Sequence, residues 1–328
     1  MKRWTIIAAC MIIISVILGW YFLTPHLQKT QKIGMAVEFN NHAACAWIAD
    51  EEGWYNQEGL ELNSMESYAT GLTLSAALAR GDIQVAYLCL GPAILAYSRG
   101  VPIKIVCGTH KYGYGIVAKS EIKDITDLEG KKVGCVREGS QCDILLQIVI
   151  KEHNLTEIDI RRMNPPKLVM ALIAGEIDAA VLPEHYATVA ESRGFQMIAR
   201  SQDLWPNMMG SVMVVKDDLL AENPEVVKKL VKVTQAGTIY INENPEKSAE
   251  ILSRALKKAD PQGVNPTVLG EQLKLTTPEI LMASMRNLEY TNEVSAWEVQ
   301  RYVDILIELG YIDKEITSEE LLDLQYLQ

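Results

Sequence analysis

Short apolar segments alternate with longer helical segments along the first two thirds of the chain. Residues 83–88 and 177–182 have the length and composition of buried strands, and a turn and a helical segment follow each of them. From Asp217 onward the pattern is helical, with Asn-Pro-Glu start signals at Asn223 and Asn244. This alternation predicts an α/β protein whose sheets are mainly parallel and flanked by helices.

One strand-and-helix segment occurs twice. Residues 77–100 read ALARGDIQVAYLCLGPAILAYSRG, and residues 171–194 read ALIAGEIDAAVLPEHYATVAESRG. The two segments align without a gap at an offset of 94, and 11 of the 24 positions are identical. A duplication of this length predicts two similar α/β lobes, and two such lobes usually leave a cleft between them.

The repeat divides the chain into two lobes that follow an N-terminal segment. We expect residues 32–112 to form the first part of lobe 1 and residues 113–208 to form lobe 2. Residues 209–328 return to lobe 1 as a strand and the C-terminal helices. The chain then crosses between the lobes near residues 107–114 and again near 206–211, and these crossings would form a hinge.

The N-terminal segment, residues 1–31, predicts a single membrane anchor and a linker. Residues 4–23 are almost all apolar, and no charged residue lies between Arg3 and Lys29. A run of this length can cross a bilayer, and Lys2 and Arg3 predict that the rest of the chain lies outside the cytoplasm. A cleaved signal peptide, or a lipoprotein cleavage site before Cys10, would also fit this composition.

Charge and cysteine spacing exclude several classes of function. The net charge is −11, from 42 acidic and 31 basic residues, which argues against nucleic acid as a partner. The cysteines show no C-x-x-C pair and no zinc-binding spacing, so we expect neither a metal nor a cofactor. Cys135 and Cys142 could form a disulfide, although buried free thiols are the simpler interpretation.

Ligands of open parallel sheets bind at the carboxyl ends of the strands, where six loops are predicted to meet. These loops are residues 38–42, 66–71, 88–92, 137–141, 164–166 and 182–186. Each loop opens a helix, so backbone N–H groups and the positive ends of helix dipoles would favour a small polar or anionic ligand.

Some side chains in or near these loops are candidates for ligand contacts. Ser140 lacks the G-x-S-x-G context of a nucleophile, so we expect it to form hydrogen bonds rather than to be catalytic. For each of the others a structural interpretation also stands: a surface position for His42, a core or lobe contact for the aromatic residues, and pairing with Glu138 for Arg137. The candidates are His42, Tyr68, Tyr112, Arg137, Ser140 and Trp205.

Four segments together carry a family resemblance. NHAACAWIADEEGWYNQEGLEL, YATGLTLSAALARGDIQVAYLCLGPAI, DLEGKKVGCVREGSQCDILLQ and PPKLVMALIAGEIDAAVLPEHYA resemble the solute-binding components of ABC importers for nitrate, sulfonates, taurine and thiamine-pyrimidine precursors. The resemblance covers residues 32–256 and implies a two-lobed type II periplasmic-binding-protein fold. It also implies a binding protein outside the cytoplasm whose partners are a small-molecule solute and the permease and ATPase subunits of an importer.

The ligand-contacting loops of this family match defined positions of the chain. The resemblance implies that Asn40, Asn41, His42, Tyr68, Thr70, Leu90, Gly91, Ser140, Gln141, Glu184 and His185 contact the ligand. One departure concerns the second lobe, because Pro183-Glu184-His185 stands where family members often carry Trp-Glu-Pro. The identity of the ligand is therefore not implied.

Two other classes of function share this fold or topology. A thiamine-pyrimidine-synthase-like enzyme would carry a CCCxC segment, which the sequence lacks, and a menaquinone-pathway-like enzyme in the cytosol would have no export segment. A sensor ectodomain would need a cytoplasmic signalling part, for which only Met1 to Arg3 remain. We therefore expect a binding protein rather than an enzyme.

Overall fold

The computed structural model describes residues 33–259, 261 and 273–327. The predicted anchor at residues 4–23 lies outside this part of the chain. Among the described residues, no helix is both long enough and apolar enough to cross a membrane.

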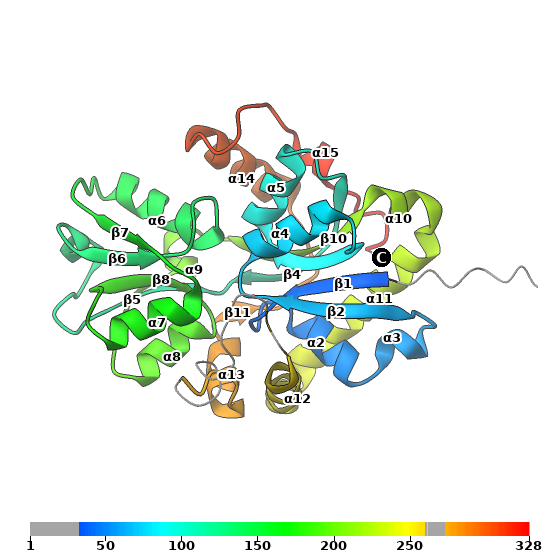
Figure 1. Cartoon of the computed structure of the whole chain (residues 1–328), viewed down its shortest axis with the longest axis horizontal. Coiled ribbons are helices and arrows are strands. Elements are labelled where there is room, and N and C mark those ends of the chain that lie inside the picture. Colours follow the sequence, from blue (N-terminus) through cyan, green and yellow to red (C-terminus); the bar gives the residue numbers. More distant parts are fainter. Residues whose placement is uncertain (1–32, 260, 262–272, 328) are drawn as a thin grey trace, which may run out of the picture. The chain divides into compact units, whose positions relative to one another are not determined.

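Strands and helices alternate from β1 to β10, as the hydrophobic pattern predicts, except that β5 directly follows β4, and the remainder is largely helical (Figure 1). The strands are β1 (Ile33–Glu38), β2 (Leu62–Tyr68), β3 (Val85–Cys89), β4 (Ile103–Tyr112), β5 (Tyr114–Ala118), β6 (Lys132–Cys135), β7 (Asp159–Arg162), β8 (Ala179–Pro183), β9 (Gln196–Arg200), β10 (Met209–Lys216) and β11 (Leu288–Glu289).

The helices of the described residues pack on both faces of the sheets (Figure 1). They are α2 (Ala44–Glu51), α3 (Trp54–Gln57), α4 (Gly71–Arg80), α5 (Leu90–Ser98), the 3-10 helix η1 (Ile125–Leu128), α6 (Gln141–Glu152), α7 (Pro165–Ile173), α8 (Tyr186–Ser192), α9 (Ser201–Leu204), α10 (Asp217–Glu222), α11 (Pro224–Glu243), α12 (Pro245–Lys258), α13 (Pro278–Met285), α14 (Ala296–Glu308) and α15 (Ser318–Leu321).

The strands form two sheets, which confirms the predicted two-sheet α/β fold. One sheet has the order β11-β4-β10-β3-β1-β2, and the other has the order β7-β6-β8-β5-β9. In Figure 1, α4 and α5 cover one face of the first sheet and α2 and α3 cover the other. Helices α6, α7 and α8 surround the second sheet in the same way.

The sheets are less uniformly parallel than the sequence predicts. Strand β10 runs antiparallel to β3 and β4, and β5 runs antiparallel to β8 and β9. The reason is topological, because β5 follows β4 after a single residue and β10 follows β9 after the short helix α9. Both strands enter their sheet at the edge where the neighbouring strands β3 and β8 end. They therefore run antiparallel to those neighbours.

The sequence repeat is also a structural repeat. Strands β3 and β8 have the same bounds when shifted by the offset of 94. The repeated glycines Gly81 and Gly175 have φ of 94° and 73°, a left-handed conformation that glycine adopts without steric cost where a helix ends. The conserved half of the repeat is therefore scaffold, and the turns that follow β3 and β8 are where the copies differ.

Candidate ligand-binding cleft

A small cavity lies at the carboxyl ends of the strands of both sheets. Each of the six predicted loops contributes at least one residue to its lining, and β5 contributes Tyr114. Its free volume of about 30 Å³ has room for one or two water molecules. The lining residues are Glu38, Asn40, Ala69, Thr70, Gly71, Cys89, Pro92, Tyr114, Val136, Ser140, Gln141, Cys142, Pro165 and Pro183.

Direct contacts join the two halves of the molecule beside this cavity. The Gly91 N–H at the start of α5 donates to Gln141 Oε1 at the start of α6, over 3.0 Å. A Cβ on Gly91 would lie 2.7 Å from Ile144 Cδ1, so any larger residue there would require the Ile144 side chain to move. The Tyr186 hydroxyl donates to the Phe39 carbonyl oxygen over 3.1 Å, which links α8 to the loop after β1. A solute larger than water can enter only if these contacts open.

Glu38, the last residue of β1, is the central ionisable group of the cavity. Its Oε1 accepts the Cys89 N–H over 2.7 Å, and its Oε2 accepts from the Cys89 thiol over 3.1 Å and from Asn40 Nδ2 over 3.2 Å. Burial raises the pKa of Glu38, against the lowering effect of these donors. Within the described part of the chain, no Lys or Arg forms an ion pair with Glu38.

Three buried histidines lie outside the cavity lining, with the His42 and His110 rings 4.3 Å apart, and all three are held neutral. Burial lowers the pKa of His42 well below its usual value, with a further lowering by His110. Burial lowers the pKa of His110 to about 4 and that of His185 to about 3. The His42 Nε2 lies 3.0 Å from the Gly113 carbonyl oxygen, while its Nδ1 has no hydrogen-bond partner. These rings therefore supply no positive charge to balance Glu38.

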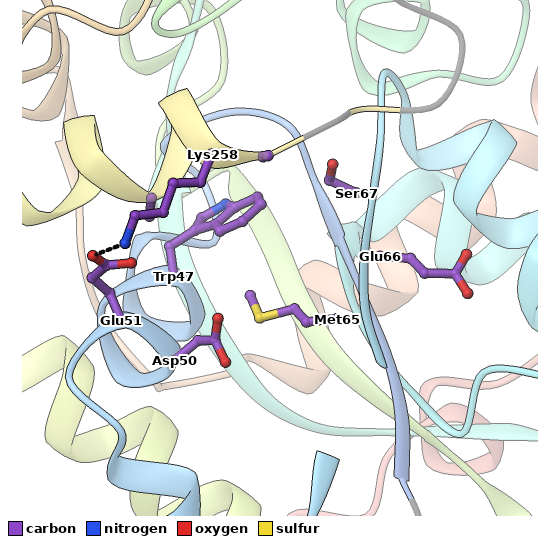
Figure 2. Close-up of a pocket in the computed structure, with 9 residues that line it drawn as sticks. Trp47, Asp50, Glu51, Met65, Glu66, Ser67 and Lys258 are labelled. Carbon is purple, nitrogen blue, oxygen red and sulfur yellow. Dashed lines mark hydrogen bonds and ion pairs between the residues drawn. The ribbon is translucent and has the colours of Figure 1, made fainter. Parts of the chain in front are cut away.

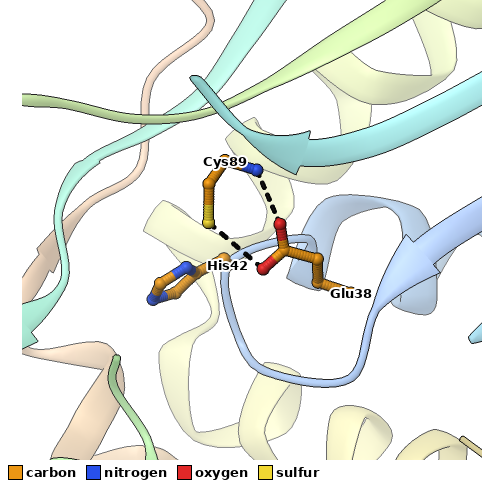
Figure 3. Close-up of side chains that lie close together, drawn as sticks. All are labelled: Glu38, His42 and Cys89. Atoms are coloured by element: carbon orange, nitrogen blue, oxygen red, sulfur yellow. Dashed lines mark hydrogen bonds between the residues drawn. The ribbon is translucent and has the colours of Figure 1, made fainter. Parts of the chain in front are cut away.

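Glu38, His42 and Cys89 converge, as Figure 3 shows. One potential ligand atom from each lies within 4.8 Å of the other two, and all three side chains are buried. A carboxylate, an imidazole and a thiol form a donor set that zinc can use. However, the Cys89 thiol donates to Glu38, and burial raises its pKa well above the usual value, so it is not poised as a thiolate. The expectation of no metal stays a prediction.

Four of the predicted ligand residues line the cavity: Asn40, Thr70, Ser140 and Gln141. Leu90 and Gly91 lie beside it in the first turn of α5 and are buried. Asn41, His42 and His185 are buried and do not line the cavity, although each carries a buried polar atom without a hydrogen-bond partner.

The other predicted ligand residues have partners elsewhere. The Tyr68 hydroxyl donates to Glu66, and the Glu184 carboxylate pairs with Arg200. Trp205 is fully buried, where it stacks on Tyr302 and donates to Glu298. None of these three is among the residues that line the cavity.

Arg137 and Tyr112 also lie outside the cavity lining. Arg137 is exposed and lines a separate groove with Arg99 and Arg162. Tyr112 ends β4 at the crossing between the sheets. The cavity lining therefore contains no Lys, Arg or His side chain.

Sequence reasoning did not single out Glu38, Cys89 or Tyr114. Glu38 and Cys89 both lie inside predicted loops. The sequence signal that could have identified Glu38 is its position as a single carboxylate at the end of an apolar strand. Tyr114 lies in a crossing strand, and its hydroxyl is 2.9 Å from Cys89 Sγ. Nothing in the sequence places β5 against β3, because they belong to different sheets.

A larger hollow of about 350 Å³ lies between α2, β2 and α12 (Figure 2). Trp47 and Met65 form its apolar side, and the Lys258–Glu51 ion pair of 2.6 Å lies at its edge. Its lining residues come from one half of the molecule, and none of them lies within residues 113–208, the range predicted for lobe 2. The cavity between the sheets is the better candidate because both halves build it.

Comparison with known proteins identifies a family and several related binding proteins. The model of the NMT1-like family matches residues 27–256. A putative binding protein of Brucella abortus is 28% identical over 223 residues, which cover 64% of this chain and 66% of that protein, slightly less than two thirds of its length. The taurine-binding periplasmic protein of Escherichia coli is 26% identical over 259 residues, covering 76% of this chain and 80% of that protein.

Solved structures show the same fold. The alkanesulfonate-binding protein of Xanthomonas axonopodis pv. citri superposes with a TM-score of 0.73 at 15% identity, over 89% of this chain and 98% of that chain. At this identity the likeness establishes the two-lobed architecture alone.

Proposed function

The chain belongs to the NMT1-like family, and from this premise we propose that it is the extracytoplasmic solute-binding component of an ABC importer. It captures a small polar or anionic organic solute, of the sulfonate, nitrate or pyrimidine-precursor class, and delivers it to a permease driven by an ATPase subunit. The observation that carries this proposal is the cavity built by six strand-end loops of two sheets. The relatives named above are binding proteins, which supports this function over an enzyme on the same fold.

Closure of the two lobes is the proposed mechanism of capture. The crossings from β4 to β5 and from α9 to β10 form the hinge, and Tyr112, Gly113 and Asn207 there have φ of 65°, 83° and 64°. Few residues absorb the change in backbone angles when lobes open and close. The free volume of about 30 Å³ is too small for an organic solute, so capture of such a solute requires the lobes to move apart.

A bound solute is expected to raise the melting temperature of the exported part. A ligand at 100 times its dissociation constant adds about 2.7 kcal/mol to the free energy of unfolding. Thermal-shift measurements with sulfonates, nitrate, pyrimidines and amino acids would detect this rise in melting temperature. Stabilisation by none of these solutes, together with turnover of one of them, would show that the protein is an enzyme instead.

The N-terminal segment, residues 1–31, is proposed to anchor the protein in the cell membrane, with the binding domain outside the cytoplasm. The uncharged residues 4–23 support this role. A C-terminal fusion to a reporter enzyme that is active only outside the cytoplasm should be active, and deletion of residues 4–23 should abolish the activity. Activity of a cytoplasm-specific reporter at the same position would contradict the proposal.

A further inference from the structure

The groove that contains Arg137, here called the arginine groove, lies apart from the cavity and has a volume of about 490 Å³. Arg99 and Arg162 also line it, and among its described lining residues Glu138 is the only acidic one. Arg99 and Arg137 are exposed, and within the part of the chain that the structure describes neither forms an ion pair. The pairing of Arg137 with Glu138 that the sequence left open is therefore not formed. On a chain of net charge −11, the arginine groove is a local excess of positive charge.

The walls of the arginine groove come from different halves of the molecule. Leu95 and Arg99 lie in and at the end of α5, which covers the first sheet, and Tyr311 follows α14, which contacts α5. Arg137 lies between β6 and α6, and Arg162 ends β7, so both belong to the half that contains the second sheet. The groove is therefore complete only while the two halves are in contact.

Buried Asp143 joins the arginine groove to the candidate ligand-binding cavity. Its Oδ2 accepts from the Tyr311 hydroxyl over 2.6 Å, and its Oδ1 lies 2.6 Å from Arg162 Nη2. The Arg162 guanidinium also donates to the Val136 carbonyl oxygen over 2.7 Å, so its position is fixed. The Asp143 N–H donates to Ser140, which lines the cavity. The start of α6 therefore contributes to both the cavity and the groove.

We propose that the arginine groove is a docking surface for an acidic peptide segment of the protein that receives the solute. This inference rests on the proposed function, in which a permease must distinguish the closed protein from the open one. Guanidinium groups pair with carboxylates through two parallel hydrogen bonds, which suits arginine to acidic side chains. A volume of about 490 Å³ is in the range that holds a drug-sized molecule, so a short peptide segment fills the groove better than a single small anion.

The test is the binding of a fluorescently labelled hexaglutamate peptide to the full chain in a neutral detergent, measured by fluorescence anisotropy at pH 7 and low ionic strength. The wild type should bind the peptide, and added salt should weaken the binding. Arg99→Gln and Arg137→Gln should each weaken it about threefold or more, because each removes an exposed charge that has no partner in the protein. Both variants should keep the wild-type melting temperature and the wild-type response to solutes.

Arg161→Gln is the matched control for these two variants. It makes the same charge change next to Arg162, but Arg161 does not line the arginine groove and pairs with Asp159. The control should bind the peptide as the wild type does. An equal loss of binding in Arg161→Gln would show that the peptide responds to surface charge in general, which would overturn the proposal.

A variant without a charge change tests whether the groove depends on contact between the halves. Tyr311→Phe keeps every charge and removes the hydroxyl group that donates to Asp143. It should weaken peptide binding about twofold or more, because the closed arrangement loses a hydrogen bond to a buried carboxylate. Unchanged binding in Tyr311→Phe would contradict the proposal that the groove reports closure.

Two further results would overturn the docking surface. One is the absence of peptide binding to the wild type at low ionic strength. The other is tighter binding of inorganic pyrophosphate than of the peptide, lost in Arg137→Gln, which would assign the groove to a small anion. These measurements need no bound solute, so their failure is distinct from failure of the thermal-shift test of the proposed function.

Discussion

Replacement of Arg200 with methionine is expected to destabilise the folded protein by about 3 kcal/mol, because it would leave a buried carboxylate without its counter-charge. Glu184 is fully buried, and its Oε1 lies 3.0 Å from Arg200 Nη1. Asn287 and Thr188 also donate to this carboxylate, but neither carries a charge. Methionine keeps much of the arginine stem and removes the guanidinium alone.

Urea unfolding of Arg200→Met and of the Arg200→Met/Glu184→Gln double variant would measure this effect. The double variant should recover part of the lost stability, since a neutral amide needs no counter-charge. Arg161→Met is the matched control, because the Arg161–Asp159 pair is about half exposed and should contribute less than about 1 kcal/mol. A loss below about 1 kcal/mol for Arg200→Met would indicate that Glu184 is protonated in the folded state, in line with the direction in which burial shifts its pKa.

Gly237→Ala is expected to destabilise the protein by about 1–3 kcal/mol, although alanine is ordinarily better than glycine inside a helix by about 1 kcal/mol. Gly237 lies in the middle of α11, where this helix packs against α2. A Cβ there would lie 2.7 Å from the Cys45 carbonyl oxygen and 2.9 Å from Cys45 Cα. These are backbone atoms, so the two helices would have to move apart.

Thermal and urea unfolding of Gly237→Ala would give the sign of the effect as well as its size. Ile239→Ala is a suitable control on the same helix, because Ile239 is 56% exposed and its truncation should change stability by less than about 0.5 kcal/mol. A stabilised Gly237→Ala variant would show that α2 and α11 are not packed at backbone contact.

Much of the fold could be predicted because its signals are local in the sequence. The alternation of apolar strands and helices follows from the period of hydrophobic positions, and the repeat predicts that β3 and β8 are equivalent. The six loops at the strand ends follow from the same pattern, and residues from all of them line the cavity. The opposite direction of β5 and β10 was not predicted, because it depends on where the chain crosses between the sheets.

The individual side chains of the site were harder to predict. Arg137 and Ser140 lie in one loop, yet Ser140 lines the cavity and Arg137 lies in a separate exposed groove. Trp205 was a candidate for stacking on a ligand, but it is a core residue held by Tyr302 and Glu298. A residue type indicates which contacts a side chain can form, and the direction of its Cα–Cβ bond decides which one it forms.

The sequence by itself determined the two-sheet α/β architecture, the family and the loops that meet in the cleft, because local periodicity and an internal repeat encode them. Only the tertiary structure decided the charge of the cleft. Glu38 reaches Cys89 across 51 positions of sequence, and the hydrogen bond from Gly91 to Gln141 joins the starts of α5 and α6. Such contacts depend on the packing of distant segments, and they determine that helix starts around the cavity are filled by side chains of the protein itself.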